Sequence, residues 1–390
     1  MNHSLNPRFI HNFFIISILL LIIRPLFATE SLIPTPPAIN ASSYLLMDAS
    51  SGKIIMSKNA DQAIPPASLT KIMTSYVTEY ELSKGNIQLD DQVPISVKAW
   101  RKAGSKMYVK EGTKVLLSDL LKGVIIQSGN DASIALAEYI AGSEDAFADL
   151  MNKHAARLGM TNTHFVNATG WPSKNHYSTA QDLALLSQAL IEDFPEHYGL
   201  YAEKSFTYND ITQPNRNTLL HSSDNVDGIK TGHTEEAGYC LVASAFENGM
   251  RLISVITGTD SDRARAQESR KMLTYGFRFY ETKKVYSTEI VITTQHVWKG
   301  QTKALDLVSS KDVYLTYPRG QYEDLSEILE LPQYIEAPIN TGDKIGKLNF
   351  KLGDEVMAST PLIAKAGIAR GGFFGNLWDS IRLFFAQLFS

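Results

Sequence analysis

Cysteine is almost absent from this chain of 390 residues, which has only Cys240. An internal disulfide is therefore excluded, and a domain of this size buries enough apolar surface to fold without one. We expect Cys240 to be a small buried side chain. The histidines include no H-x-x-x-H pair, and no C-x-x-C occurs. We therefore expect no catalytic metal and no cofactor.

Charge blocks and long apolar runs are also scarce. The net charge is −4 with no basic block, which argues against nucleic-acid binding. One apolar run, residues 13–23, follows Arg8 and is too short to cross a bilayer. It predicts a secretory signal peptide cleaved near Ala28. Arg24 and Leu26 make that cleavage site imperfect, so an uncleaved N-terminal anchor is the alternative. No other stretch could span a membrane.

A serine and a lysine lie one turn apart at the start of an expected helix. Ser68 follows two prolines, which fit at or just before a helix start. Helical periodicity then follows in six apolar residues: Leu69, Ile72, Met73, Tyr76, Val77 and Tyr80. Ser68 should therefore lie in the first turn, with Lys71 on nearly the same face. Lys71 can act as a base for Ser68 only when neutral, and burial or a second cation such as Lys230 would lower its pKa. Alone, this pair is more often a helix cap with a solvated lysine.

Two further polar motifs follow in order. The tripeptide Ser128-Gly129-Asn130 separates two helical patterns and should form a turn between them. Its serine hydroxyl can relay a proton, and its asparagine amide can hold a substrate carbonyl. The tripeptide Lys230-Thr231-Gly232 precedes two strand patterns, residues 239–245 and 250–257, joined by the hairpin signal Asn248-Gly249. Its lysine and threonine suit a carboxylate, and Gly232 would let a ligand backbone approach closely. Each motif alone is weak, but the ordered set is specific.

The chain resembles the low-molecular-mass penicillin-binding proteins that act as D-alanyl-D-alanine carboxypeptidases. The similarity extends from about Ala41 to the C-terminus. It is carried by four stretches: residues 65–74, 104–107, 126–132 and 225–234. The resemblance implies an exported serine D,D-carboxypeptidase that removes the terminal D-alanine from peptidoglycan pentapeptide stems and is acylated by β-lactams.

The resemblance also implies residue roles. Ser68 would be the acylated nucleophile, Lys71 its base and Ser128 a proton shuttle, while Asn130 would contact the substrate. The backbone N–H groups of Ser68 and His233 would form the oxyanion hole, whose preorganised donors stabilise the tetrahedral intermediate.

The same resemblance assigns the carboxylate subsite. Lys230 and Thr231, next to Gly232, would hold the terminal carboxylate of the peptide or of penicillin, with a contribution from Arg216. One departure from the family pattern is Thr169, because the family carries a histidine just before the glycine of this loop. The substitution puts the deacylation rate and the order of the loop in doubt, but not the nucleophile.

Two rival functions remain. Class A β-lactamases share the three motifs, but they use a loop glutamate to activate the deacylating water. Residues 159–182 contain no glutamate, and Asp182 fits better as a first-turn residue of a helix that ends at Ile191. The other rival is a catalytically weak penicillin-binding scaffold, which turnover of a pentapeptide would distinguish.

We expect four segments. Residues 1–28 form the signal peptide, and residues 29–284 form an α+β serine D,D-peptidase domain of the penicillin-binding type. In that domain one antiparallel sheet is completed by both chain ends around a helical subdomain. Residues 285–368 form a small all-β domain, with short strands expected at 289–294, 304–307, 313–317, 346–352 and 355–357. Residues 369–390 form an amphipathic helix.

The final helix has a strongly apolar stripe. Its members are Phe373, Phe374, Leu377, Trp378, Ile381, Phe384, Phe385, Leu388 and Phe389. Such a helix either packs on the core or lies on a membrane surface, and we favour the membrane because the preceding β domain has little core to spare. The expected location is the periplasmic side of the bacterial inner membrane.

Overall fold

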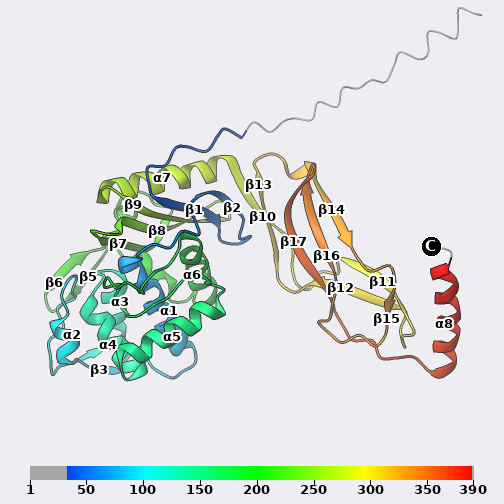
Figure 1. Cartoon of the computed structure of the whole chain (residues 1–390), viewed down its shortest axis with the longest axis horizontal. Coiled ribbons are helices and arrows are strands. Elements are labelled where there is room, and N and C mark those ends of the chain that lie inside the picture. Colours follow the sequence, from blue (N-terminus) through cyan, green and yellow to red (C-terminus); the bar gives the residue numbers. More distant parts are fainter. Residues whose placement is uncertain (1–32, 389–390) are drawn as a thin grey trace, which may run out of the picture. The chain divides into compact units, whose positions relative to one another are not determined.

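The structure is a computed structural model and describes residues 33–388. A five-stranded antiparallel sheet, in the order β2-β1-β9-β8-β7, organises the first domain (Figure 1). Its strands are β1 Ser43–Asp48, β2 Ile54–Lys58, β7 Val226–Thr234, β8 Gly238–Glu247 and β9 Met250–Thr259. The N-terminal hairpin pairs with the late strand β9, which confirms the prediction of one sheet completed by both ends. The expected hairpin between β8 and β9 turns at Asn248 and Gly249, both at positive φ.

Helices cover both faces of this sheet. Figure 1 shows α7 (Asp262–Phe279) on one face and the helical subdomain on the other. The helices of the subdomain are α1 Thr70–Ser83, α2 Val97–Arg101, α3 Leu117–Ile125, α4 Asn130–Ala141, α5 Glu144–Arg157 and α6 Ala180–Asp193. Smaller elements complete the domain: β3 Gln92–Pro94 with β4 Lys114–Leu116, β5 Ser205–Tyr208 with β6 Ile211–Pro214, and the 3-10 turns η1 Ala67–Leu69, η2 Tyr198–Ala202 and η3 Thr218–His221.

Helix α1 runs through the centre of the domain. Its periodicity predicts one apolar face, but residues 70–79 are buried on every side. Two of the buried threonines in this stretch are hydrogen-bonded to carbonyl groups: the hydroxyl of Thr74 donates to the carbonyl of Ala168 and that of Thr78 to the carbonyl of Thr74. A helix buried all round is a rigid support for Ser68 and Lys71 at its start.

The second domain is all-β, as expected. Strands β10 Tyr280–Tyr286 and β13 Val313–Pro318 pair with each other, and a six-stranded sheet has the order β14-β16-β17-β12-β11-β15. The strands of that sheet are β11 Thr293–Trp298, β12 Ala304–Ser309, β14 Leu325–Glu330, β15 Ile335–Glu336, β16 Lys344–Leu352 and β17 Glu355–Ala364, and the turn η4 (Tyr322–Asp324) precedes β14.

The strands of this domain differ from the prediction most clearly in β11, β17 and β14. The strand expected at 289–294 begins at Thr293, β17 continues to Ala364 rather than ending at residue 357, and β14 was not expected at all. Strand β14 is an edge strand whose side chains are mostly exposed. Such a strand lacks the alternation of apolar and polar residues by which half-buried strands are recognised.

The chain ends in helix α8 (Phe373–Leu388), as the periodicity predicts. Two side chains of this helix, Asp379 and Leu383, are buried. The carboxylate of Asp379 accepts hydrogen bonds from the backbone N–H of Lys299 (2.7 Å) and from the Lys303 ammonium (2.5 Å). Within residues 33–388, no helix combines the length and apolar character needed to cross a membrane. The expected signal peptide lies outside the described residues.

Candidate active site

Ser68 and Lys71 meet at the start of α1. The turn η1 that carries Ser68 begins at Ala67, whose φ is +47°, an uncommon value for a residue with a Cβ atom. The ammonium of Lys71 donates to Ser68 Oγ at 3.0 Å, to Asn130 Oδ1 at 2.8 Å and to the Thr169 carbonyl at 2.7 Å. A neutral amine has two donors and one lone pair. With its donors on Asn130 and Thr169, it can direct its lone pair at the hydroxyl of Ser68.

The surroundings of Lys71 favour the neutral amine. Complete burial, followed by the positive charges of Arg216 and Lys102, lowers the pKa of Lys71 to about 7, against an opposing effect of Asp131. The sequence predicted the burial but named Lys230 as the second cation. The two lysines repel each other, and the pKa of Lys230 is lowered well below its ordinary value by burial first and by Lys71 second. Lys71 can thus serve as a base near neutral pH.

The second motif forms the expected turn between α3 and α4. Ser128 has a φ of +60°, and its buried hydroxyl has no hydrogen-bond partner among residues 33–388. Asn130 is engaged at both ends of its amide, because Oδ1 accepts from Lys71 and Nδ2 donates to the Ala103 carbonyl at 2.8 Å. A buried hydroxyl without a partner requires an explanation. Ser128 lines the same cavity as Ser68, so its hydroxyl is available to a bound molecule.

The third motif lies within strand β7, which packs against the turn η1. A Cβ atom on Gly232 would lie 3.2 Å from both Leu69 Cγ and the Pro66 carbonyl oxygen. Close packing of the strand on the nucleophile's own turn therefore favours glycine here. Gly232 also lines the cavity, so the predicted approach of a ligand backbone stays a prediction. Lys230 is buried and its ammonium donates to the Thr231 carbonyl at 3.1 Å.

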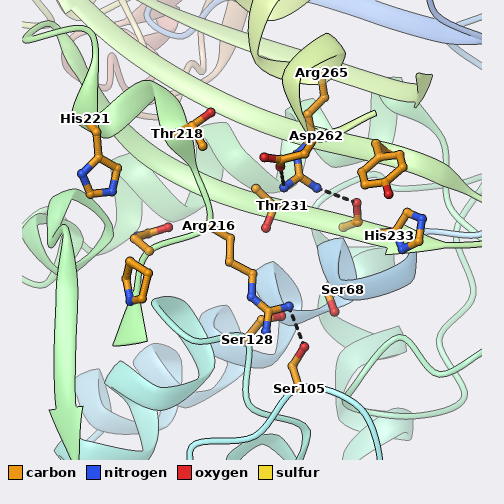
Figure 2. Close-up of a pocket in the computed structure, with 14 residues that line it drawn as sticks. Ser68, Ser105, Ser128, Arg216, Thr218, His221, Thr231, His233, Asp262 and Arg265 are labelled. Carbon is orange, nitrogen blue, oxygen red and sulfur yellow. Dashed lines mark hydrogen bonds and ion pairs between the residues drawn. The ribbon is translucent and has the colours of Figure 1, made fainter. Parts of the chain in front are cut away.

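A cavity of about 650 Å³ joins these elements (Figure 2). The expected site residues on its wall are Ser68, Ser128, Arg216, Thr231, Gly232 and His233. The other three expected residues, Lys71, Asn130 and Lys230, are buried and are not among the residues that line it. The lining also includes Ser105, Tyr239, Asp262 and Arg265, to which sequence reasoning assigned no role. They come from a loop, a strand and a helix distant in sequence, and only Ser105 belongs to a stretch that carried the resemblance.

The charge of this cavity is mainly positive. Arg265 forms an ion pair with Asp262 and donates to the Gly232 carbonyl at 3.2 Å. Arg216 is exposed, and Figure 2 shows its guanidinium donating to the hydroxyl of Ser105, at 2.7 Å. Within the described part of the chain, Arg216 has no carboxylate partner. An anionic ligand would find an uncompensated guanidinium there.

The loop that contains Thr169 is tied to the nucleophile's turn. The side chain of Thr169 donates to Asn167 Oδ1 within the loop, while its backbone carbonyl contacts Lys71. Gly170 has a φ of +80°, and a Cβ atom there would lie 1.7 Å from the Ala67 carbonyl oxygen. The contact with Lys71 thus depends on the backbone of residue 169 and not on its side-chain identity.

His176 holds the other end of this loop. Its Nδ1 accepts the backbone N–H of Val166 at 3.0 Å, and its Nε2 lies 2.7 Å from Thr70 Oγ1. Burial, and then the positive charges of His164 and Lys71, lowers the pKa of His176 to about 4. The neutral ring, with Nδ1 as acceptor, therefore donates through Nε2 to Thr70. Sequence reasoning gave no signal for this contact between residues 106 apart.

Both domains of the chain match models of known protein families. Residues 30–261 match the family model described as D-alanyl-D-alanine carboxypeptidase, and residues 280–370 match the C-terminal domain of penicillin-binding protein 5. The chain belongs to the D-alanyl-D-alanine carboxypeptidase family. This membership confirms the resemblance, the fold class and the serine carboxypeptidase assignment made from sequence.

Individual relatives match most or all of the described part of the chain to different extents. D-alanyl-D-alanine carboxypeptidase DacC of Escherichia coli (strain K12) is 46% identical over 372 residues, which are 93% of this chain and 92% of that protein. The crystal structure of penicillin binding protein 5 from Haemophilus influenzae superposes with a TM-score of 0.84 at 42% identity, covering 86% of this chain and all of that one. Penicillin-Binding Protein D2 from Listeria monocytogenes, solved in an ampicillin-bound form, has a TM-score of 0.58 at 29% identity, with coverage of 63% and 100%.

Proposed function

We propose that Ser68 is the acylated nucleophile of this carboxypeptidase and that Lys71 is its general base. The supporting observation is the 3.0 Å contact between the two side chains, with the pKa of Lys71 lowered to about 7. Neutral Lys71 takes the proton of the Ser68 hydroxyl as its oxygen attacks the carbonyl carbon of the penultimate D-alanine. Negative charge then develops on the carbonyl oxygen, where the backbone N–H groups of Ser68 and His233 are the proposed donors.

Collapse of this intermediate breaks the peptide bond. Ser128 relays a proton to the leaving amine nitrogen, and free D-alanine departs. Its unpartnered hydroxyl on the cavity wall supports this role. Water then attacks the ester carbon as Lys71 takes a proton from it. The bond between that carbon and the Ser68 oxygen breaks, and Lys71 returns the proton to this oxygen, which restores the serine hydroxyl and releases the shortened peptide. Asn130 holds Lys71 in place and contacts the substrate.

The terminal carboxylate of the peptide is the proposed ligand of Arg216, Thr231 and Lys230. Arg216 supports this assignment because its guanidinium has no carboxylate partner in the described residues and lines the same cavity as Thr231. Penicillin carries a carboxylate and a strained amide that can occupy the same positions, as the ampicillin-bound relative suggests.

Mass spectrometry of the purified protein tests this mechanism directly. Incubation with penicillin should add one penicillin mass to the peptide that contains Ser68, and incubation with a pentapeptide ending in D-Ala-D-Ala should release D-alanine. Labelling without D-alanine release would support the scaffold alternative instead. Rapid release of hydrolysed penicillin would support a β-lactamase, for which residues 159–182 provide no glutamate.

We also propose that helix α8 binds a membrane surface on the periplasmic side of the inner membrane. Its apolar side chains are exposed, including Phe373 (77%), Phe374 (84%) and Trp378 (61%). The opposite face is held to the β domain by Asp379 and by the hydroxyl of Tyr334, which donates to the Ala386 carbonyl at 3.0 Å. An apolar face left in solvent by a helix anchored on its polar side suits insertion into a lipid interface.

Flotation with liposomes of phosphatidylethanolamine and phosphatidylglycerol tests the membrane proposal. A chain lacking residues 372–390 should remain in the soluble fraction and still release D-alanine, because none of the deleted residues lines the cavity around Ser68. Replacing Trp378 and Phe374 by serine should weaken flotation in the full chain. Flotation of the truncated chain would assign the attachment to the N-terminal segment.

A further inference from the structure

Ser105, which lines the cavity, belongs to the segment 103–109. This segment has no regular secondary structure. The backbone N–H of Asn130 donates to the Ser105 carbonyl at 2.7 Å, and Asn130 Nδ2 donates to that of Ala103. Ser105 in turn accepts the hydrogen bond of Arg216. The position of segment 103–109 therefore determines where Arg216, which is proposed to bind the substrate carboxylate, is held.

One buried side chain, Asp131, gathers this segment. Its carboxylate accepts the backbone N–H groups of three consecutive residues: Met107 at 3.0 Å, Tyr108 at 2.9 Å and Val109 at 3.2 Å. It also accepts the N–H of Ala132 at 2.9 Å, and it lies in the first turn of α4, where a negative charge is favoured. Asp131 is fully buried. Four donors on one carboxylate satisfy a charge that would otherwise be costly to bury.

The geometry around Asp131 explains two other features. Tyr108 is held at a φ of +69° although it has a bulky side chain and is more than half exposed. The bend lets three successive N–H groups face one carboxylate, which offsets its conformational cost. Gly129, the middle residue of the second motif, has no room for a side chain, since a Cβ atom would lie 2.9 Å from Asp131 Oδ1 and 3.2 Å from Met107 N. The carboxylate of Asp131 fills the space beside the motif.

We propose that Asp131 is a positioning residue of the D,D-carboxypeptidase site, whose carboxylate fixes segment 103–109 against Asn130 and so sets the place of Ser105 and Arg216. The inference rests on the proposed function for its catalytic consequence. Asp131 acts through its neighbours, because it does not line the cavity.

Asp131 has a second effect, on Lys71. Five titratable or charged groups interact with Lys71: Asp131, Arg216, Lys102, Lys230 and His176. Asp131 is the one whose charge raises the pKa of Lys71, against burial and the cations. Loss of this charge should move the pKa of Lys71 further down. A residue that served stability alone would not shift the pH dependence of acylation in this direction.

The test compares the full chain with Asp131→Asn, which preserves the shape but presents an amide N–H to N–H donors. We expect acylation by penicillin at pH 8 to fall roughly tenfold to a hundredfold, as for a misplaced catalytic geometry. We also expect a higher KM for the pentapeptide, a lower pH midpoint of acylation, and faster amide exchange at residues 107–109. Asp149→Asn, at an exposed aspartate of α5, is the matched control and should change none of these.

Gly129→Ala separates positioning from charge, because the added Cβ atom disturbs the same contacts while the carboxylate remains. Acylation should fall with the pH midpoint unchanged, and this variant replaces Asp131→Asn if the latter does not fold. Wild-type amide exchange at residues 107–109 together with wild-type acylation in either folded variant would overturn the inference. Absence of labelling in the wild-type chain would overturn the proposed function alone, since amide exchange measures the positioning without activity.

Discussion

The rate at which penicillin acylates Ser68 should depend on the protonation of Lys71. The pKa of Lys71 is lowered to about 7, chiefly by burial. Only the neutral amine can take the serine proton, so acylation should increase as pH rises through this value. A solvated lysine would titrate about three units higher, and its neutral fraction would still be rising at the alkaline end of the accessible range.

The magnitude follows from the neutral fraction. With a pKa of about 7, the amine is neutral in about one tenth of molecules at pH 6 and about nine tenths at pH 8. The second-order acylation rate should therefore rise close to tenfold per unit at acid pH and become level above about pH 8. Lys71→Arg removes this dependence, because a guanidinium remains protonated. It should reduce the rate by about two orders of magnitude or more, as for loss of a general base.

Stopped-flow measurements with a fluorescent penicillin between pH 5.5 and 9 provide the assay, and penicillin has no group that titrates in this range. Lys153→Arg, at an exposed lysine of α5, is the matched control and should behave like the wild type. The reasoning would be refuted by a flat profile, by a midpoint above pH 9, or by near-normal acylation of Lys71→Arg. Any of these results would place the base elsewhere.

Three other changes have expected outcomes. Ser68→Ala should abolish penicillin labelling, because Ser68 carries the one hydroxyl that is hydrogen-bonded to Lys71 among residues 33–388. Labelling of the variant, seen by mass spectrometry, would refute the assignment. The pKa of Lys71 is lower in the folded than in the unfolded state, so the unfolded chain binds more protons between about pH 7 and 10.5. The free energy of unfolding should therefore rise with pH across that window, by up to about 4–5 kcal/mol. Urea unfolding of Lys71→Met should lack this contribution, and an identical pH dependence in both chains would contradict it. Gly170→Ala should destabilise the fold by several kcal/mol, because its Cβ atom would overlap the Ala67 carbonyl. The control Gly112→Ala, at a similar φ in open space, should cost only about 1 kcal/mol. Equal melting temperatures of the two variants would contradict the predicted clash.

The elements around the site could be predicted because their signals are local. Periodicity after Ser68 specifies α1, apolar runs on both sides of Ser128 specify α3 and α4, and Asn248-Gly249 specifies the hairpin beside β7. Each signal is contained within about ten residues and reflects steric preferences of the chain itself. The order of the three motifs then indicated the chemistry.

Contacts between distant segments could not be predicted in the same way. The need for Gly232 depends on Pro66 and Leu69, which lie more than 160 positions earlier, and the cations that lower the pKa of Lys71 come from two separate loops. The link between His176 and Thr70 is of the same kind. Sequence patterns report the face a residue presents, whereas these features depend on which other element packs there.

Helix α8 shows how one long-range contact can decide between two local interpretations. Its apolar stripe is compatible with burial against the β domain or with exposure to a lipid surface, and periodicity alone cannot distinguish them. Asp379 decides the orientation, because the Lys303 ammonium and the Lys299 backbone N–H hold its carboxylate and lower its pKa. With the polar side of the helix directed at the β domain, the stripe of phenylalanine and tryptophan faces away from it. Exposure of so large an apolar surface is unfavourable in water by roughly 25 cal/mol per Å², and this cost is the physical basis of the proposal that α8 binds a membrane surface.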